Sequence, residues 1–176
     1  PGIERIRLDA VLRAPTIDYG AATLAEWNLQ AVRAPQVWEL GYRGQGVTVA
    51  ILDSGVDGTH PDLRTQYRGG DNSWFDPYGE HATPYDTFGH GTAVAGIVLG
   101  RNSSGSVVGV APDAQWIAAK IFDDNNQATF SAIHQAFQWL LDPDGDPATN
   151  DAPDVVNASW GLLGGAACSN EFERDG

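Results

Sequence analysis

The 176 residues contain no methionine and a single cysteine, and Lys and Arg together number 10 against 23 Asp and Glu. With Cys168 alone, the chain has no internal disulfide, and nothing beyond that residue supports thiol chemistry. The net charge of −13 argues against nucleic-acid binding, which needs clustered basic side chains. No apolar run reaches the roughly 18 residues that a membrane helix requires, so we expect no membrane span.

The two ends of the chain also lack expected features. No initiator Met is present, and Pro1 is not part of a basic and apolar leader, so no signal peptide is visible. We therefore expect both ends to be cuts in a longer gene product. The length suits one domain, and a composition of 42% hydrophobic and 19% charged residues is typical of a globular protein.

Apolar segments alternate with helical patterns along the chain. We expect strands at residues 46–52, 115–121 and 154–159, and helices at residues 34–41, 91–100 and 129–141. The last helix has the clearest apolar stripe, formed by Ala132, Ile133, Ala136, Phe137, Leu140 and Leu141. Strands separated by helices predict an α/β fold with a doubly wound, mainly parallel sheet flanked by helices, incomplete in this chain. Sites in such folds lie at the carboxyl ends of the strands.

Two residues have the chemistry of a proton relay. Asp53 directly follows the predicted buried strand 46–52, where a carboxylate can orient an imidazole; an aspartate that caps a turn explains the same residue. His90 lies between Gly89 and Gly91 at the start of a small-residue helix, and histidine is suited to base catalysis near neutrality. A helix-capping histidine is the alternative.

The surroundings of both residues resemble those of the catalytic Asp and His in the subtilase family of serine proteases (peptidase S8). The matching segments are 50–56 (AILDSGV), 57–63 (DGTHPDL), 90–96 (HGTAVAG), 109–112 (GVAP), 119–121 (AKI) and 155–161 (VVNASWG). They occur in the family's order, and the likeness covers residues 27–161.

The resemblance implies a serine-type endopeptidase that cleaves peptide bonds in proteins through an Asp-His-Ser triad. Asp53 and His90 would be its first two members, and the serine, expected in a Gly-Thr-Ser motif, would lie beyond the fragment. We expect the complete protein to be active and the fragment alone to be inactive. The alternatives are a catalytically inactive subtilase-fold protein that binds peptides, and a metal hydrolase built on His and Asp residues.

Substrate recognition in the family pairs an extended peptide with protein strands on both sides. Asn126, Gln127 and Ala128 match one wall, and Ser159, Trp160 and Gly161 match the other. Phe130 and Trp160 would line an apolar pocket a few residues upstream of the scissile bond; the alternative is that both are ordinary core residues.

No cofactor is required for this chemistry, but the resemblance suggests structural calcium. Asp62 matches a calcium-ligand position of many relatives, although Arg101 lies near the remaining expected ligands. The alternating Asp142, Asp144 and Asp146 are either a solvated loop or a second calcium site. Asn102-Ser-Ser is a glycosylation sequon.

The resemblance also predicts the organisation of the chain. Residues 1–25 would hold the end of an inhibitory propeptide and the maturation junction; the alternative is an N-terminal extension that stays attached. The apolar residues of an expected edge strand there are Ile3, Ile6, Leu8, Val11 and Leu12. Residues 26–176 would be the amino-terminal part of the catalytic domain, without its serine. Expected partners are protein or peptide substrates and the chain's own propeptide as inhibitor, and the expected location is extracellular.

Overall fold

The computed structural model describes residues 11–13, 27–101, 103 and 107–161. Most of the predicted propeptide end and maturation junction, together with Asn102 and Cys168, lies outside the described residues. In the part that is described, no helix is both long and apolar enough to cross a membrane.

A four-stranded parallel sheet forms the centre of the structure, with the strand order β3-β4-β2-β6. Its strands are β2 (Thr48–Asp53), β3 (Trp74–Phe75), β4 (Gln115–Lys120) and β6 (Val155–Ala158). The near-continuous apolar runs of the two central strands suit burial on both faces, and from Ala50 to Leu52 no residue is exposed. Three of these strands confirm the sequence prediction; β3 is too short to leave a periodic signal.

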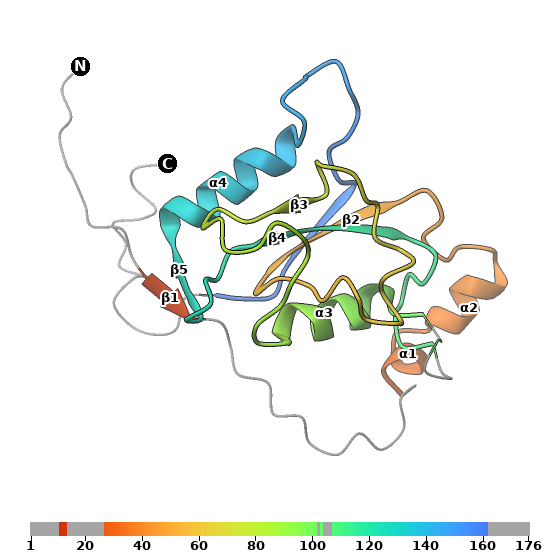
Figure 1. Cartoon of the computed structure of the whole chain (residues 1–176). Coiled ribbons are helices and arrows are strands. Elements are labelled where there is room, and N and C mark those ends of the chain that lie inside the picture. The colour runs from red at the N-terminus through yellow and green to blue at the C-terminus, as the bar shows by residue number, and fades with distance from the viewer. Residues whose placement is uncertain (1–10, 14–26, 102, 104–106, 162–176) are drawn as a thin grey trace, which may run out of the picture.

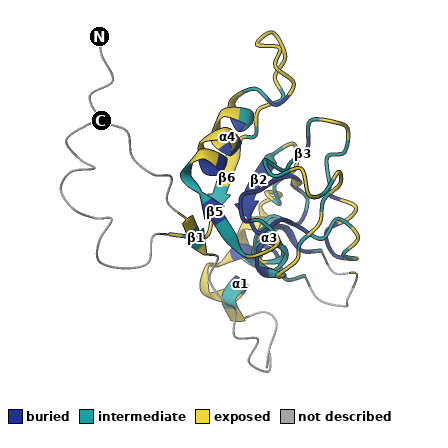
Figure 2. Cartoon of the chain, turned by 60° about the vertical axis from the view of Figure 1, so that its left-hand side comes forward, coloured by how far each residue is buried: buried dark blue, intermediate teal, exposed yellow. Residues whose placement is uncertain are grey.

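Helices cover both faces of this sheet (Figures 1 and 2). Along β2, Val49 and Ile51 pack in one core cluster with residues of α3 (His90–Leu99), whereas Ala50 and Leu52 pack in the other with residues of α4 (Phe130–Leu141). Alternate residues of a strand point to opposite faces, so one short strand serves two cores. The predicted α/β fold, with a mainly parallel sheet flanked by helices, is confirmed.

Two shorter helices, α1 (Trp27–Ala31) and α2 (Ala34–Glu39), precede β2. The sequence predicted α2 from Pro35 near its start and Gly41 just after its end, and the structure confirms it. It did not predict α1, which has only five residues and a single buried side chain, Leu29.

The stripe predicted on α4 is correct in four of its six residues. Ala132, Ile133, Ala136 and Leu140 are buried. Phe137 and Leu141 are exposed, so their assignment to the buried stripe was wrong. Each follows a buried neighbour by one residue, and a turn of about 100° carries it off the face that meets the sheet.

A second, small sheet joins two distant parts of the chain. β1 (Val11–Arg13) pairs antiparallel with β5 (Gln127–Thr129), and Leu12 lies opposite Ala128. Of the edge strand expected in the first residues, only the end at Val11 and Leu12 falls within the described residues, and there it is a strand. Leu12 also packs against the core cluster that includes Leu52 and Ile133.

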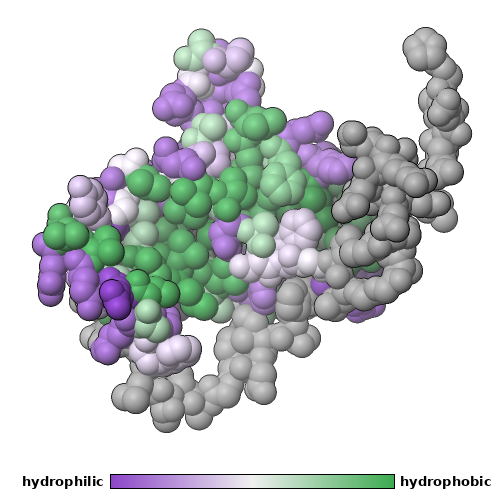
Figure 3. All heavy atoms as spheres, turned by 180° about the vertical axis from the view of Figure 1, so that it is seen from behind, coloured by the Kyte–Doolittle hydropathy of each residue, from purple (hydrophilic) through white to green (hydrophobic). Residues whose placement is uncertain are grey.

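The edge strand β6 is exposed on both sides, unlike the central strands. Val155 and Val156 point to opposite faces and are 51% and 42% exposed. Seen from behind in Figure 3, hydrophobic residues form a broad area over the middle of the molecule. An open edge and exposed apolar area of this kind favour association.

Candidate active site

Asp53 is the last residue of β2 and is completely buried. Its Oδ1 accepts the backbone N–H of Ser54 at 2.7 Å, which fixes the carboxylate at the carboxyl end of the strand. The backbone carbonyl of Asp53 accepts the N–H of Ile121 at 2.9 Å. The residue therefore lies at the strand ends where sites in parallel α/β sheets form.

His90 is the first residue of α3 and is 8% exposed. Its Nδ1 lies 2.5 Å from Oδ1 of Asp53. A carboxylate can only accept, so the neutral ring carries its proton on Nδ1 and leaves Nε2 as the basic nitrogen. Both residues predicted from sequence are thus brought together, in the geometry of a general base held by an acidic partner.

Burial dominates the electrostatics of this pair. It raises the pKa of Asp53 above the usual carboxyl range, partly offset by the hydrogen bond with His90 and that from Ser54. Among the described residues, Oδ2 of Asp53 has no hydrogen-bond partner. The His90 ring is therefore one of the few groups that compensate this buried carboxylate, together with the Ser54 N–H.

Two glycines allow β2 and α3 to approach this closely. A Cβ added at Gly91 would lie 2.0 Å from the Gly55 carbonyl oxygen and 2.9 Å from Asp53 Cβ. At Gly55, which has a φ of +110°, a Cβ would lie 1.9 Å from the Tyr85 carbonyl oxygen. The backbone around the pair therefore has no room for side chains.

Of the two predicted substrate walls, the one that contains Trp160 contacts the end of β2. Asn126 adopts a left-handed conformation with a φ of 60°, and Gln127 and Ala128 follow it in β5. On the other wall, Trp160 Nε1 donates to the carbonyl of Leu52 at 3.0 Å, one residue before Asp53. Of the remaining residues predicted there, Ser159 and Gly161 are exposed and lie after the end of β6.

The two aromatic residues predicted to line a pocket contact the same core cluster. Phe130 and Trp160 are both partly buried and pack against the core cluster that contains Leu52 and Ile133. Leu12 of β1 packs against the same cluster. The two aromatics are therefore neither fully in the core nor free of it.

Tyr78 was not singled out in the sequence. Its hydroxyl donates to the carbonyl of Ile121 at 2.9 Å and also lies 3.4 Å from the carbonyl of Gln127 in β5. Burial raises the pKa of this phenol to about 12. No sequence signal marks it, since a tyrosine in a loop between motifs has many uses.

A charged network adjoins the turn before β5. The carboxylate of Asp124 contacts His81 Nε2 at 3.0 Å, Lys120 Nζ at 3.2 Å and the Thr87 hydroxyl at 2.5 Å. Hydrogen bonding, chiefly from Thr87, lowers the pKa of Asp124 to about 2. Glu80, His81 and Asp124 are close enough to share a cation, but Lys120, completely buried, supplies a positive charge beside them. We read the group as an ion-pair network.

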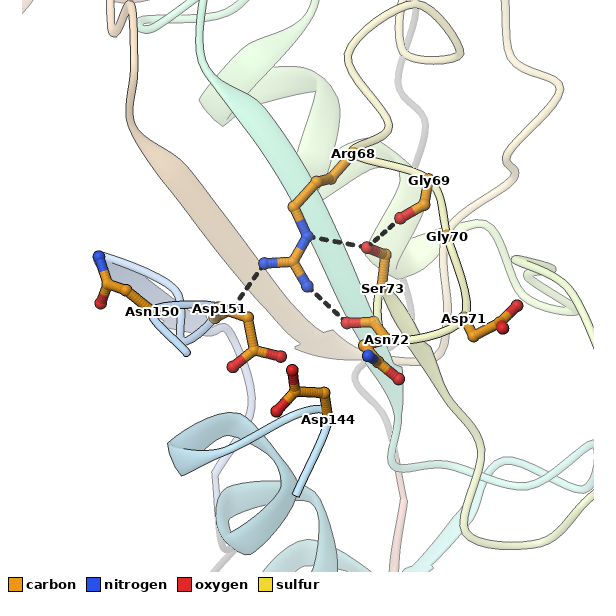
Figure 4. A pocket seen from close by; sticks show the side chains of 9 residues that line it. All are labelled: Arg68, Gly69, Gly70, Asp71, Asn72, Ser73, Asp144, Asn150 and Asp151. Atoms are coloured by element: carbon orange, nitrogen blue, oxygen red, sulfur yellow. Dashed lines mark hydrogen bonds between the residues drawn. The ribbon is translucent and has the colours of Figure 1, made fainter. Parts of the chain in front are cut away.

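A polar pocket of about 310 Å³ lies between the turn before β3 and the loop before β6 (Figure 4). Arg68 spans it, donating to the Asn72 carbonyl at 2.5 Å, the Asp151 carbonyl at 2.6 Å and the Ser73 hydroxyl at 2.9 Å. Asp144 and Asp151 face each other on one side. The guanidinium is thus used to join two loops.

The residues of the two calcium expectations lie in different surroundings. Asp62 is 5% exposed, and its carbonyl accepts the N–H of Arg101, but it belongs to no group of three metal-ligating side chains among the described residues. In the acidic loop, Asp142 and Asp144 lie near Asp151 rather than sharing a ligand group with Asp146. Asp146 instead closes a local turn by accepting the Ala148 N–H.

Of the three members expected of a serine-protease relay, the described part of the chain contains two. Among the described residues, no serine hydroxyl is hydrogen-bonded to the His90 ring. Ser54, adjacent in sequence to Asp53, uses its hydroxyl to donate to Asp86 and to accept from the Gly91 N–H.

Comparison with known proteins gives consistent matches. The profile of the subtilase family matches residues 44–174. Bacillopeptidase F of Bacillus subtilis (strain 168) is 40% identical over 164 residues, which are 85% of this chain and 11% of that protein. The major intracellular serine protease of the same organism is 32% identical over 134 residues, 76% of this chain and 40% of that protein. Subtilisin E is 37% identical over 136 residues, 77% of this chain and 32% of that protein. The chain thus spans well under half the length of these curated relatives.

Proposed function

Because the chain belongs to the subtilase family, we propose that Asp53 and His90 are the relay residues of a serine endopeptidase that cleaves peptide bonds in proteins. The observation that carries the proposal is the 2.5 Å contact of His90 Nδ1 with Asp53 Oδ1 at the carboxyl end of β2. The serine is proposed to lie further along the same protein, in a Gly-Thr-Ser motif that these 176 residues do not contain.

In this mechanism His90 Nε2 takes the proton of the serine hydroxyl as the serine attacks the scissile carbonyl, and later gives it to the leaving amine. Asp53 holds the Nδ1–H tautomer and stabilises the imidazolium, without itself becoming protonated. The buried carboxylate suits that role, since its unpaired Oδ2 leaves His90 as the main compensation for its charge.

We propose that the peptide substrate adds a strand along β5, with residues 159–161 as the opposite wall. The support is that β5 already accepts an extended segment: Leu12 lies opposite Ala128 in an antiparallel pair. Residues 1–25 are accordingly proposed to be the end of an inhibitory propeptide that occupies the substrate strand's place before maturation.

We propose that Phe130 and Trp160 line an apolar subsite beside β5. Both are partly buried against the cluster that Leu12 also contacts. A peptide side chain in the place of Leu12 would meet the same surface, which favours an apolar residue there.

We also propose an extracellular location and a structural calcium ion. Export is proposed from the resemblance to subtilisins, although one relative is named an intracellular serine protease. Calcium at Asp62 would be structural, and no chemical step is assigned to it.

The test uses the full-length protein, with a peptide substrate and a fluorophosphonate that labels activated serines. We expect labelling and hydrolysis, and a fall of about 10⁴-fold in kcat for Asp53→Asn, because the wrong histidine tautomer is then held. Asp113→Asn, which changes a surface partner of Arg43 at 2.8 Å, is the matched control and should leave kcat unchanged. Peptide binding without labelling or hydrolysis would identify an inactive binding protein instead. Hydrolysis that a chelator abolishes, without labelling, would identify a metal hydrolase.

A further inference from the structure

One carboxylate outside the relay pair, that of Asp86, contacts both the loop that follows β2 and the first turn of α3. Asp86 lies four residues before His90, in the segment between β3 and α3. Its backbone forms an antiparallel bridge with Gly55, two residues after Asp53. The backbone alone thus places Asp86 next to the end of β2.

The side chain of Asp86 accepts five hydrogen bonds. Oδ1 accepts the Ser54 hydroxyl at 2.9 Å and the backbone N–H groups of Phe88 and Gly89 at 3.1 and 2.9 Å. Oδ2 accepts the Thr92 N–H at 2.9 Å and the Thr92 hydroxyl at 2.6 Å. Hydrogen bonds to a carboxylate are stronger and shorter than those between neutral groups.

Some of these donors lie next to Asp53 in the chain, and others lie next to His90. Ser54 is the neighbour of Asp53, and Thr92 stands two residues after His90 in the first turn of α3. The Ser54 hydroxyl in turn accepts the Gly91 N–H at 3.0 Å, and the Thr92 hydroxyl accepts the Asp57 N–H at 2.9 Å. The network therefore links the segment just after β2, which ends in Asp53, to the first turn of α3, which begins with His90.

The helix start depends on Asp86 for a second reason. The first turn of a helix leaves N–H groups without partners, and α3 begins after Gly89, which has no side chain to cap them. Asp86 accepts one of them, that of Thr92. A negative charge near a helix amino terminus is also favourable for the helix dipole.

We propose that Asp86 is a positioning residue for the relay: it fixes the first turn of α3 against the Ser54 loop, and so holds the His90 ring at Asp53. This inference rests on the proposed function. The carboxylate of Asp86 bonds to Ser54 and to the start of α3 rather than to either relay side chain. Burial is the main cause of the raised pKa of Asp53, and the negative charge of Asp86 also contributes to it. Because a misplacement of about 1 Å can cost on the order of 100-fold in rate, loss of this clamp should lower kcat more than it weakens substrate binding.

The experiment compares Asp86→Asn with Asp76→Asn in the full-length protein. Asp76 is the matched control: it belongs to the same segment and its carboxylate accepts two backbone N–H groups, from Tyr78 and His81, but it does not contact α3 or Ser54. Two readouts are used, kcat and KM for a peptide substrate, and the NMR resonance of the proton on His90 Nδ1, which is shifted far downfield when it is shared with a carboxylate.

We expect Asp86→Asn to lower kcat at least ~10-fold with KM changed less than ~3-fold, and to shift or broaden the Nδ1–H resonance. Asp76→Asn should leave kcat within ~2-fold and the resonance in place. If Asp86→Asn does not fold, Ser54→Ala replaces it, because this change removes the hydroxyl bonds to Asp86 and to the Gly91 N–H. We expect it to lower kcat more than it changes KM and to shift or broaden the Nδ1–H resonance. An unchanged resonance and kcat in these variants, or equal losses in Asp76→Asn, would overturn the proposal. If the wild-type protein hydrolyses no peptide, the proposed function has failed, and the resonance alone decides the positioning role.

Discussion

Leu12 and Ala128, 116 positions apart in the chain, are register partners in the antiparallel pairing of β1 with β5. Leu12 is partly buried against the core cluster, whereas Val11, its neighbour in β1, is 56% exposed. Leu12 and Val11 thus belong to the same strand, but only Leu12 packs against the core cluster.

If this strand is the end of an inhibitory propeptide, Leu12→Asp should weaken inhibition. Burial of a leucine side chain stabilises by about 1.5–3 kcal/mol at most, and a partly buried one by less, so we expect up to ~10-fold more activity before proteolytic maturation. The measurement is peptide hydrolysis by the freshly refolded full-length protein, followed as residues 1–25 are removed. Val11→Asp is the matched control and should have little effect; equal effects of both would argue against a specific site for Leu12.

The close approach of α3 to β2 predicts that glycine-to-alanine substitutions at two positions of α3, Gly91 and Gly96, have opposite effects on stability. Gly91→Ala places a Cβ against the Gly55 carbonyl, so the helix start must move away from Asp53. We expect a loss of stability of roughly 1–3 kcal/mol and at least ~10-fold in kcat. At Gly96 an added Cβ meets nothing within 4 Å, so Gly96→Ala should stabilise by about 0.5–1 kcal/mol and leave kcat unchanged. Urea unfolding and steady-state kinetics measure both, and a tolerated Gly91→Ala would contradict the described packing.

Tyr78 predicts a stability change in alkaline solution. Its pKa is raised to about 12 in the folded protein, against 10.0 ordinarily. Between these values the unfolded chain has lost the proton and the folded chain has kept it, so the free energy of unfolding falls as pH rises from 10 to 12. Tyr78→Phe should make this fall shallower, although it also lowers stability at pH 8 by about 0.5–1.5 kcal/mol through the lost hydrogen bonds.

The measurement for Tyr78 is the urea midpoint of the full-length protein across this pH range. Tyr42→Phe is the control, because Tyr42 is 70% exposed and should leave the slope as it is in the wild type. Identical slopes in wild type and Tyr78→Phe would show that this phenol is not the group responsible.

The proposed apolar subsite predicts a change in specificity. Phe130→Ala should reduce the preference for a large apolar residue over alanine at the peptide position that meets this surface, by up to ~10-fold in kcat/KM, since an apolar contact contributes about 1–3 kcal/mol. Phe137→Ala is the control on the same helix, because Phe137 is 42% exposed. Digestion of a peptide library by full-length variants measures the preference. A profile that is flat in the wild type at every position upstream of the cleaved bond would remove the basis for the subsite.

The open side of the sheet predicts the behaviour of the 176-residue chain on its own. Val155 and Val156 expose both faces of the edge strand β6. Hydrophobic residues also form a broad area on the back of the molecule (Figure 3). We expect the isolated chain to be poorly soluble or only partly folded, because such edges and areas associate. Calorimetry and sedimentation measure this; a sharp cooperative melt of a monomer would contradict it.

Much of the fold follows from local patterns. The apolar run ending in Asp53 predicts a buried strand because only strands covered on both faces are hydrophobic throughout. The spacing of Ala132, Ile133, Ala136 and Leu140 predicts the buried side of α4. The same pattern failed for Phe137 and Leu141, since hydrophobicity does not say how wide a stripe the sheet will cover.

The sequence by itself determined the family resemblance and the two residues proposed for the relay, because both lie in short motifs whose order can be read along the chain. Only the tertiary structure decided that Asp53 and His90 meet at 2.5 Å, that Asp86 bonds to both Ser54 and Thr92, and that Tyr78 reaches β5. The physical reason is that each of these contacts joins residues from separate elements. Their distances depend on how strand, helix and loop pack together, down to the missing side chain of Gly91, and no local pattern records that packing.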